Sequence, residues 1–321
     1  GGGASYANRA RVVSFDKPYP YHWAAGSAGW IGTEFSFLML AERHGLDLAY
    51  LTDVDMHARP ESIQAHQCLV SLGHDEYWSK AMRDGALAAL DKGVNFAFLG
   101  ANACYRHIRL EDSPVGPYRR EVCYKDGPED PLYGVDNADV TANWYDGPDS
   151  WAESNLVGSM YQCYGGSGDM VIVDPGSWLL HGTGLAAGDR IVKVIGSEFD
   201  ACAPALGSPS NIRIVSHAPT PSAIGNWYSD MTWFTSQKPG GGGVFASGTM
   251  NFIPFLWDNP GTLPTSWAFD AIPGATKQLE QITLNVLAVT GEGPASRTFP
   301  SEPNWESYYK PTDTGLTGGE K

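Results

Sequence analysis

The stretch CLVSLGHDEYWSKAMRDGALAALDKGVNFAFLGANACY, residues 68–105, decides the fold class. It contains two short, almost continuous apolar runs, 68–72 and 95–99, which are typical of strands buried on both faces. Between them, residues 79–91 carry apolar side chains at helical spacing, and Ser79 is a good N-cap. The order strand, helix, strand predicts a right-handed crossover between parallel strands.

The flanking segments extend this pattern. We expect further strands at 11–15, 48–52, 170–173, 191–195, 212–215 and 244–246, and helices at 33–44, 60–66 and 275–289. The sequence therefore predicts an α/β fold, a three-layer α/β/α domain with a mostly parallel sheet, long loop insertions and an elaborated second half. We assign one catalytic-type domain to 1–290, with a surface insertion at about 125–168, and a polar C-terminal tail to 291–321.

Composition excludes several classes of partner. The chain has 321 residues, and its 21 Lys and Arg against 36 Asp and Glu give a net charge of −15. Such a chain is repelled by phosphate backbones and anionic lipid, so we expect neither nucleic acid nor a membrane as a partner. No apolar run of about 18 residues is present.

Two further features bear on location. The start, residues 1–5, lacks the basic and apolar regions of a signal peptide. The five cysteines are odd in number and widely spaced, which favours buried reduced thiols over a disulfide framework. Together these features predict a cytoplasmic protein.

Several common catalytic motifs are absent. The sequence contains no dinucleotide-binding glycine fingerprint, phosphate loop, zincin motif or serine-hydrolase elbow. A cysteine nucleophile would stand two residues after Gly100, but that residue is Asn102. Cys104 lies two positions later, so a cysteine hydrolase is only a minor alternative.

Ionisable residues gather where predicted strands end, the edge at which open α/β sheets bind ligands. One strand-to-helix turn contains four ionisable residues, His74, Asp75, Glu76 and Tyr77. These residues either form part of a functional site or cap the next helix. The segment 53–57, with the pattern D-x-D-x-H, is either an oxygen-rich metal site or a capped loop.

Six segments of the chain resemble one known family. They are VSFDKPY, EFSFLMLAERHG, YLTDVDMH, residues 70–111, VCYKD and GGGVFASGTMNF. The resemblance is to the C-terminal domain of the N,N-dimethylformamidase large (beta) subunit and covers about 11–289. It implies a glutamine-amidotransferase-like fold. It also implies a founding activity, in which a small formamide is hydrolysed to an amine and formate by a mononuclear iron held by two tyrosines and one glutamate.

Carried onto this sequence, the resemblance implies a set of metal ligands. Tyr77 in GHDEYW is the first tyrosine, and Tyr118 is the second, with Tyr124 as its rival. Glu198 in GSEFD is the carboxylate. Phenolate and carboxylate are hard anionic donors, which suit Fe(III).

The sequence departs from the family pattern at one position. The family places a histidine two residues before its glutamate, where this chain has Gly196. We expect His74, Asp75 or Glu76 to take over its proton chemistry. Asn102 either donates a hydrogen bond to the developing oxyanion or ties the turn.

The leading functional prediction is an iron-dependent amidohydrolase that cleaves a C–N bond of a small amide or formamide. The missing histidine motivates one alternative, a mononuclear non-haem iron enzyme with oxidative chemistry. A second is a non-catalytic carbohydrate-binding module, motivated by tryptophans that otherwise belong to the core, namely Trp144, Trp151, Trp178, Trp227 and Trp233. The expected partner is a small-molecule substrate, while a homo-oligomer and a small partner subunit both stay open.

Overall fold

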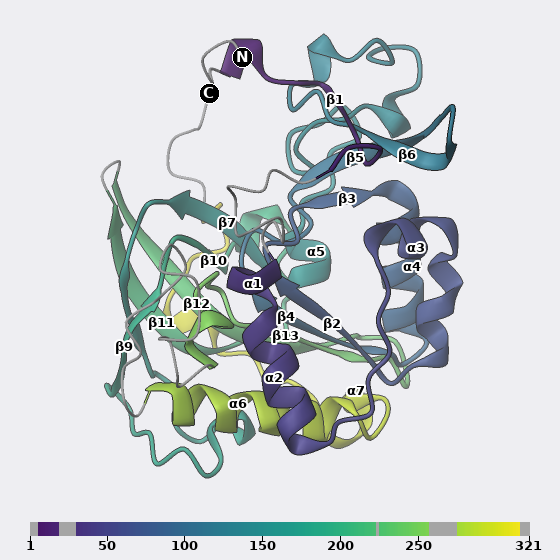
Figure 1. The fold of residues 1–321 in the computed structure, drawn as a ribbon. Coiled ribbons are helices and arrows are strands. Elements are labelled where there is room, and N and C mark those ends of the chain that lie inside the picture. The colour runs from purple at the N-terminus through teal and green to yellow at the C-terminus, as the bar shows by residue number, and fades with distance from the viewer. Residues whose placement is uncertain (1–5, 19–29, 223–224, 257–274, 315–321) are drawn as a thin grey trace.

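The computed structural model describes residues 6–18, 30–222, 225–256 and 275–314. Its central sheet has five strands in the order β11 (Arg213–Ser222), β12 (Gly225–Thr235), β13 (Gly243–Ala246), β4 (Asn95–Gly100) and β2 (Cys68–Gly73) (Figure 1). Strands β13, β4 and β2 are parallel, whereas β11, β12 and β13 pair antiparallel. The protein is thus a mixed α/β protein, and the expectation of a mostly parallel sheet is wrong. Strands β11 and β12 follow each other directly in the chain, which only antiparallel pairing allows.

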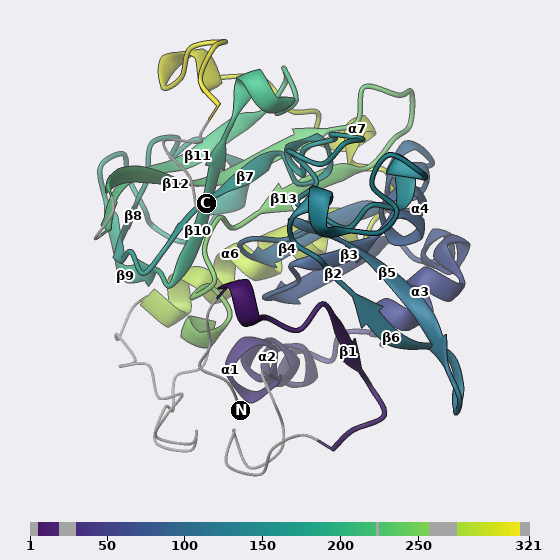
Figure 2. The ribbon, with the colours of Figure 1, turned by 90° about the horizontal axis from the view of Figure 1, so that it is seen from above.

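Helices cover both faces of this sheet, because the buried strands present apolar side chains in both directions. Phe96 and Phe98 of β4 join one core cluster, and Ala97 and Leu99 join the other. The first cluster is covered by α3 (Asp53–Ala58), α4 (Lys80–Asp91) and α5 (Ser154–Val157). The second is covered by α2 (Phe35–His44) and α6 (Ala275–Thr290). Figures 1 and 2 show these two groups of helices.

Within the described ranges, three smaller sheets complete the fold. One has the order β1 (Val12–Ser14), β6 (Gly116–Val122), β5 (Arg106–Ser113), β3 (Tyr77–Ser79), and the others pair β10 (Glu198–Cys202) with β7 (Ser159–Tyr164) and β8 (Gly168–Val171) with β9 (Arg190–Ile195). The remaining helices are α1 (Trp30–Thr33) and α7 (Ala295–Thr298). Short 3-10 helices span Tyr6–Asn8, Pro60–Ala65, Gly127–Glu129, Asn137–Asp139, Trp178–Leu180, Pro204–Leu206, Pro254–Leu256 and Trp305–Ser307.

The local signals around the first crossover are confirmed. The Ser79 hydroxyl caps α4 by accepting a hydrogen bond from the Met82 backbone N–H. Gly45 ends α2 in the left-handed conformation, with φ of 63°. Within the range expected to form a surface insertion, 125–168, the structure has α5 and the largely buried strand β7.

The strand expected at 48–52 does not form. Tyr50 and Leu51 are exposed, and no sheet in the described residues includes them. Thr52 instead caps α3 through a reciprocal bond with Asp55. The D-x-D-x-H segment is therefore the first turns of a helix, and the Nδ1 of His57 lies 2.7 Å from the Ser79 hydroxyl.

The described part of the tail is fastened to the sheet. The Asn304 side chain accepts a hydrogen bond from the Ile214 N–H and donates one to the Ile214 carbonyl. The Tyr309 hydroxyl donates to the Asp230 carboxylate at 2.6 Å. No helix in the described ranges has the length and apolar character needed to cross a bilayer.

Candidate active site

Parallel pairing brings two strand ends to the same edge of the central sheet. Gly73 at the end of β2 is the partner of Gly100 at the end of β4. A Cβ added to Gly100 would lie 1.9 Å from the Gly73 carbonyl oxygen, so this close approach requires glycine. The chain continues from these two residues to His74 and Asn102, which therefore emerge side by side.

We call His74, Glu76, Glu198, Asn102 and Arg106 the His74 cluster. The Nε2 atom of His74 lies 3.1 Å from Glu198 Oε2 and 3.3 Å from Glu76 Oε2. Hydrogen bonds to Glu198 and Glu76 raise the pKa of His74 to about 10, although burial acts in the opposite direction. The side chain is therefore an imidazolium at neutral pH, held between two carboxylates.

Glu76 is the buried member of this pair. The Nε of Arg106 donates to Glu76 Oε1 at 3.0 Å, and the Arg106 guanidinium also donates to the Asn143 side chain. Burial alone would raise the pKa of Glu76, but the hydrogen bond from His74 and the charge of Arg106 outweigh it and lower that pKa. Glu76 is thus a carboxylate throughout the neutral range.

Asn102 links β4 to β10. Its backbone N–H donates to both carboxyl oxygens of Asp200, at 2.8 and 3.0 Å, and its Nδ2 donates to Glu198 Oε2 at 3.0 Å. Its Oδ1 is buried and accepts no hydrogen bond from the described residues. The side-chain amide has a second N–H, and its use as a donor to a developing oxyanion stays a prediction.

Asp200 is a carboxyl of the site that sequence reasoning did not single out. It is buried on β10, and burial raises its pKa to about 7 against the effect of the Asn102 N–H, while the charge of Glu198 raises it further. Its place two residues after Glu198 in one strand is the signal that points to it. Arg106, which neutralises Glu76, was also missed, because it lies beyond the turn that drew attention.

Asp75 is held inside the turn. Its carboxylate accepts hydrogen bonds from the Ser71 hydroxyl at 2.6 Å and from the Trp78 indole N–H at 2.8 Å. Removal from water raises its pKa against these bonds. The contacts fix the shape of the loop that carries His74, while a catalytic role for Asp75 stays a prediction.

The predicted tyrosines have separate surroundings. Lys125 Nζ donates to the Tyr77 hydroxyl at 2.8 Å, and burial with the nearby Glu76 charge raises the pKa of this phenol, which is therefore protonated. The Tyr118 ring packs edge-on against His57, with ring centroids 4.8 Å apart. Within the described residues, no hydrogen bond joins Tyr118 or Tyr124 to Tyr77 or Glu198.

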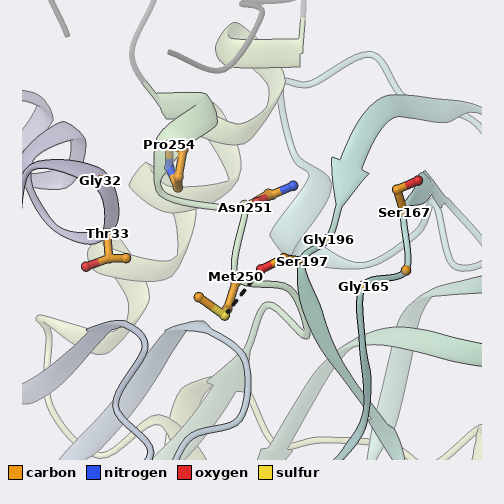
Figure 3. Close-up of a pocket in the computed structure, with 10 residues that line it drawn as sticks. Gly32, Thr33, Gly165, Ser167, Gly196, Ser197, Met250, Asn251 and Pro254 are labelled. Atoms are coloured by element: carbon orange, nitrogen blue, oxygen red, sulfur yellow. Dashed lines mark hydrogen bonds between the residues drawn. The ribbon is translucent and has the colours of Figure 1, made fainter. Parts of the chain in front are cut away.

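A pocket with a volume of about 420 Å³ (Figure 3) is lined by residues that adjoin members of the cluster in the chain or in space. Ser197 lines it and directly precedes Glu198, and the Met250 N–H donates to the Glu198 carbonyl at 3.1 Å. Thr33 also lines it and packs against Gly73, which directly precedes His74. The other lining residues are Gly32, Gly165, Gly166, Ser167, Gly196, Met250, Asn251 and Pro254.

Residues 1–262 match the family described as N,N-dimethylformamidase beta subunit-like, C-terminal. The chain belongs to this family. The match confirms the resemblance inferred from the six sequence segments, and membership points to a hydrolase that acts on amides. No curated protein matches the chain.

The formamidase-like family raises the question of a metal ion. Tyr77 and Glu198 have the hard oxygen atoms that Fe(III) prefers, and Tyr77 adjoins the cluster through Glu76, so their donor chemistry fits such an ion. No three His, Cys, Asp or Glu side chains in the described ranges are arranged to hold a metal. The ligand set Tyr77, Tyr118 and Glu198 stays a prediction.

The tryptophans that motivated a sugar-binding module lie mainly in the core. Trp144, Trp227 and Trp233 are buried, and Trp178 packs edge-on against Trp233. Trp151 is 37% exposed, and its ring stacks on the buried Arg83 guanidinium. These positions favour the core-packing interpretation over a carbohydrate platform.

Proposed function

We propose that the chain hydrolyses the C–N bond of a small amide or formamide, with the His74 cluster as the site that moves protons. Membership of the formamidase-like family gives the reaction class. The observation that carries the proposal is the position of His74 Nε2, within 3.3 Å of two carboxylates at an edge of the sheet. As part of this proposal we infer a glutamine-amidotransferase-like arrangement around β2, α4 and β4, supported by the parallel register of the two strands.

Amide hydrolysis needs one proton removed from water and one delivered to the leaving nitrogen. The imidazolium of His74 is the donor for the leaving amine. The Glu76 and Glu198 carboxylates are the acceptors for the proton of the attacking water, and either can return it to Nε2 across its hydrogen bond. Water and amide are consumed, acid and amine are formed, and the cluster ends in its starting protonation state.

The remaining residues position the charged groups of the cluster and stabilise the charge that develops on the substrate. The hydrogen bond from His74 and the charge of Arg106 keep Glu76 ionised, and Glu198 and Glu76 together keep His74 charged. Asn102 holds Glu198 with one side-chain N–H and offers the other to the carbonyl oxygen as negative charge develops there. Asp200 fixes Asn102 by accepting its backbone N–H with both oxygens.

We include iron in the proposal, with Tyr77 and Glu198 as the residues that would hold it. A bound ferric ion supplies polarisation of the amide carbonyl and of water. Metal analysis of the wild type beside Tyr77→Phe and Glu198→Gln tests this part. We expect a sharp loss of iron in both variants without loss of folding, and full occupancy in either variant would remove that residue from the ligand set.

The hydrolytic part is tested by measuring amine release from formamides by the wild type and by His74→Gln. We expect the variant to lose about 10²–10⁴-fold in rate, the range for a general acid or base. His217→Gln is the matched control, because the Nδ1 of His217 also bonds a carboxylate, that of Asp230, at 2.7 Å outside the cluster. Equal rates for His74→Gln and wild type would refute the assignment, and substrate-dependent oxygen uptake without amine release would indicate oxidative chemistry instead.

A further inference from the structure

The pocket beside the His74 cluster is large for the smallest amides. Its volume of about 420 Å³ lies within the roughly 300–1,000 Å³ of pockets that enclose drug-sized ligands. A dimethylated formamide has about five heavy atoms, and at the ~30 Å³ that a water molecule occupies in the liquid it fills roughly 150 Å³. More than half of the pocket would stay unfilled by such a substrate.

The lining selects against charge. The residues that line the pocket include no Asp, Glu, Lys, Arg or His in the described part of the chain. Met250 and Pro254 offer apolar surface, four glycines contribute backbone, and the remaining lining residues have uncharged polar side chains (Figure 3). The Ser197 hydroxyl is directed toward the Met250 sulfur, 3.9 Å away, rather than toward a charged partner. An ionised group would meet no opposite charge among these lining residues.

Backbone geometry keeps this space open. Gly196 has φ of 144°, and a Cβ there would lie 3.0 Å from both Asn251 Nδ2 and the Gly166 carbonyl oxygen. A side chain at this position would therefore be strained and crowded.

The contacts on both sides tie the pocket to the proton-moving residues. Ser197 and Met250 flank the Glu198 backbone, and Thr33 packs on the residue before His74. We propose that the pocket binds an uncharged, apolar substituent of the amide, and that the substrates of this chain are amides whose substituent is an alkyl or aryl group well beyond methyl. This inference rests on the proposed amide hydrolysis and adds the class of substrate.

The test compares N-methyl-, N-butyl- and N-benzylformamide as substrates of the intact protein. Each methylene buried in the pocket is expected to raise kcat/KM about fourfold, which corresponds to ~0.8 kcal/mol. Met250→Trp, which fills the pocket, should lower the ratio of kcat/KM for the benzyl over the methyl substrate at least tenfold. Met250→Leu keeps the volume and should keep the ratio, and thermal melts report whether each variant folds.

Binding measured separately distinguishes failure of this inference from failure of the proposed hydrolysis. Isothermal titration of the His74→Gln protein with the same three amides gives affinities that need no turnover. We expect the affinity to rise with substituent size and to be lost when His74→Gln is combined with Met250→Trp. That result would support substituent binding in the pocket even if no amide is hydrolysed. Equal kcat/KM for the three amides in the wild type, together with equal affinity of His74→Gln for them, would overturn the inference, whereas hydrolysis of the methyl substrate would leave the proposed function standing.

Discussion

Replacing Glu198 by Gln should lower the pKa of His74, because the hydrogen bond to Glu198 is the largest cause of the raised value. Glu198 is the closer of the two carboxylates, at 3.1 Å against 3.3 Å for Glu76. An opposite charge within about 4–6 Å shifts a pKa by roughly 1–3 pH units, and we expect a fall of that size from about 10. The value should stay above the ordinary 6.5, since Glu76 still faces Nε2.

The measurement is an NMR titration of the histidine ring signals in chelator-treated protein, so that no cation competes for the carboxylates. The His74→Gln spectrum assigns the signal. Glu280→Gln is the matched control, because Glu280 pairs with His44 at 2.8 Å on the surface and should leave His74 unchanged. A wild-type His74 that titrates near 6.5, or a Glu198→Gln protein with an unshifted midpoint, would refute the charge arrangement of the cluster.

The ion pair between His74 and Glu198 also stabilises the folded protein, by an amount that depends on pH. The pKa of His74 is raised in the folded state, so its contribution is complete below pH 6.5 and is lost as pH rises through about 10. His74 keeps 36% of its side chain exposed, and solvent screening reduces the net contribution to about 1 kcal/mol. Glu76→Gln is a poorer probe, because it would leave the buried Arg106 guanidinium without its carboxylate.

Two further predictions concern the scaffold. Burial raises the pKa of Glu153 to about 8, so the folded protein holds a proton there that the unfolded chain releases above 4.5, and stability falls with rising pH between these values. Urea unfolding at pH 5 and pH 8 should show a smaller loss of stability in Glu153→Gln than in wild type, and parallel losses would contradict this account. Gly100→Ala should cost about 3 kcal/mol or more, since its Cβ would meet the Gly73 carbonyl oxygen at 1.9 Å. Gly45→Ala, which has open space but φ of 63°, should cost only about 1 kcal/mol, and similar denaturation midpoints for the two variants would refute the close-approach argument.

Local sequence patterns correctly predicted those helices and strands whose own residues favour the structure that the fold requires. Strand β2, helix α4 and strand β4 follow from apolar runs and from the Ser79 cap. The segment 48–52 has the composition of a strand, but Thr52 and Asp55 form a capping box that commits the chain to a helix. The sequence patterns did not predict strands β5, β7, β10 and β12, because these strands depend on their pairing partners more than on their own sequences.

The residues of the candidate site also fall into those that local sequence could predict and those that only the fold identifies. His74 and Glu76 could be nominated from one short turn, because ionisable side chains at a strand end are a local signal. Glu198 could be placed after a predicted strand, but its role came from family resemblance, since its contact with His74 spans more than a hundred residues of chain. Arg106 and Asp200 could not be assigned beforehand, because their roles depend on which carboxylate and which backbone N–H the fold brings to them.

Charge balance explains how the predicted iron ligands and the present hydrogen bonds are compatible. The carboxylates of Glu76 and Glu198 are matched by the cations of His74 and Arg106, so the cluster is neutral by itself. A ferric ion held by Tyr77 and Glu198 would add positive charge beside that balance, and protons would have to leave in exchange, first that of the Tyr77 phenol. The imidazolium of His74 is the group in direct contact with Glu198 that can release one, whereas Arg106 stays charged at any working pH. In the proposal, bound iron would therefore lower the pKa of His74, which would make its imidazolium a stronger proton donor to the leaving amine.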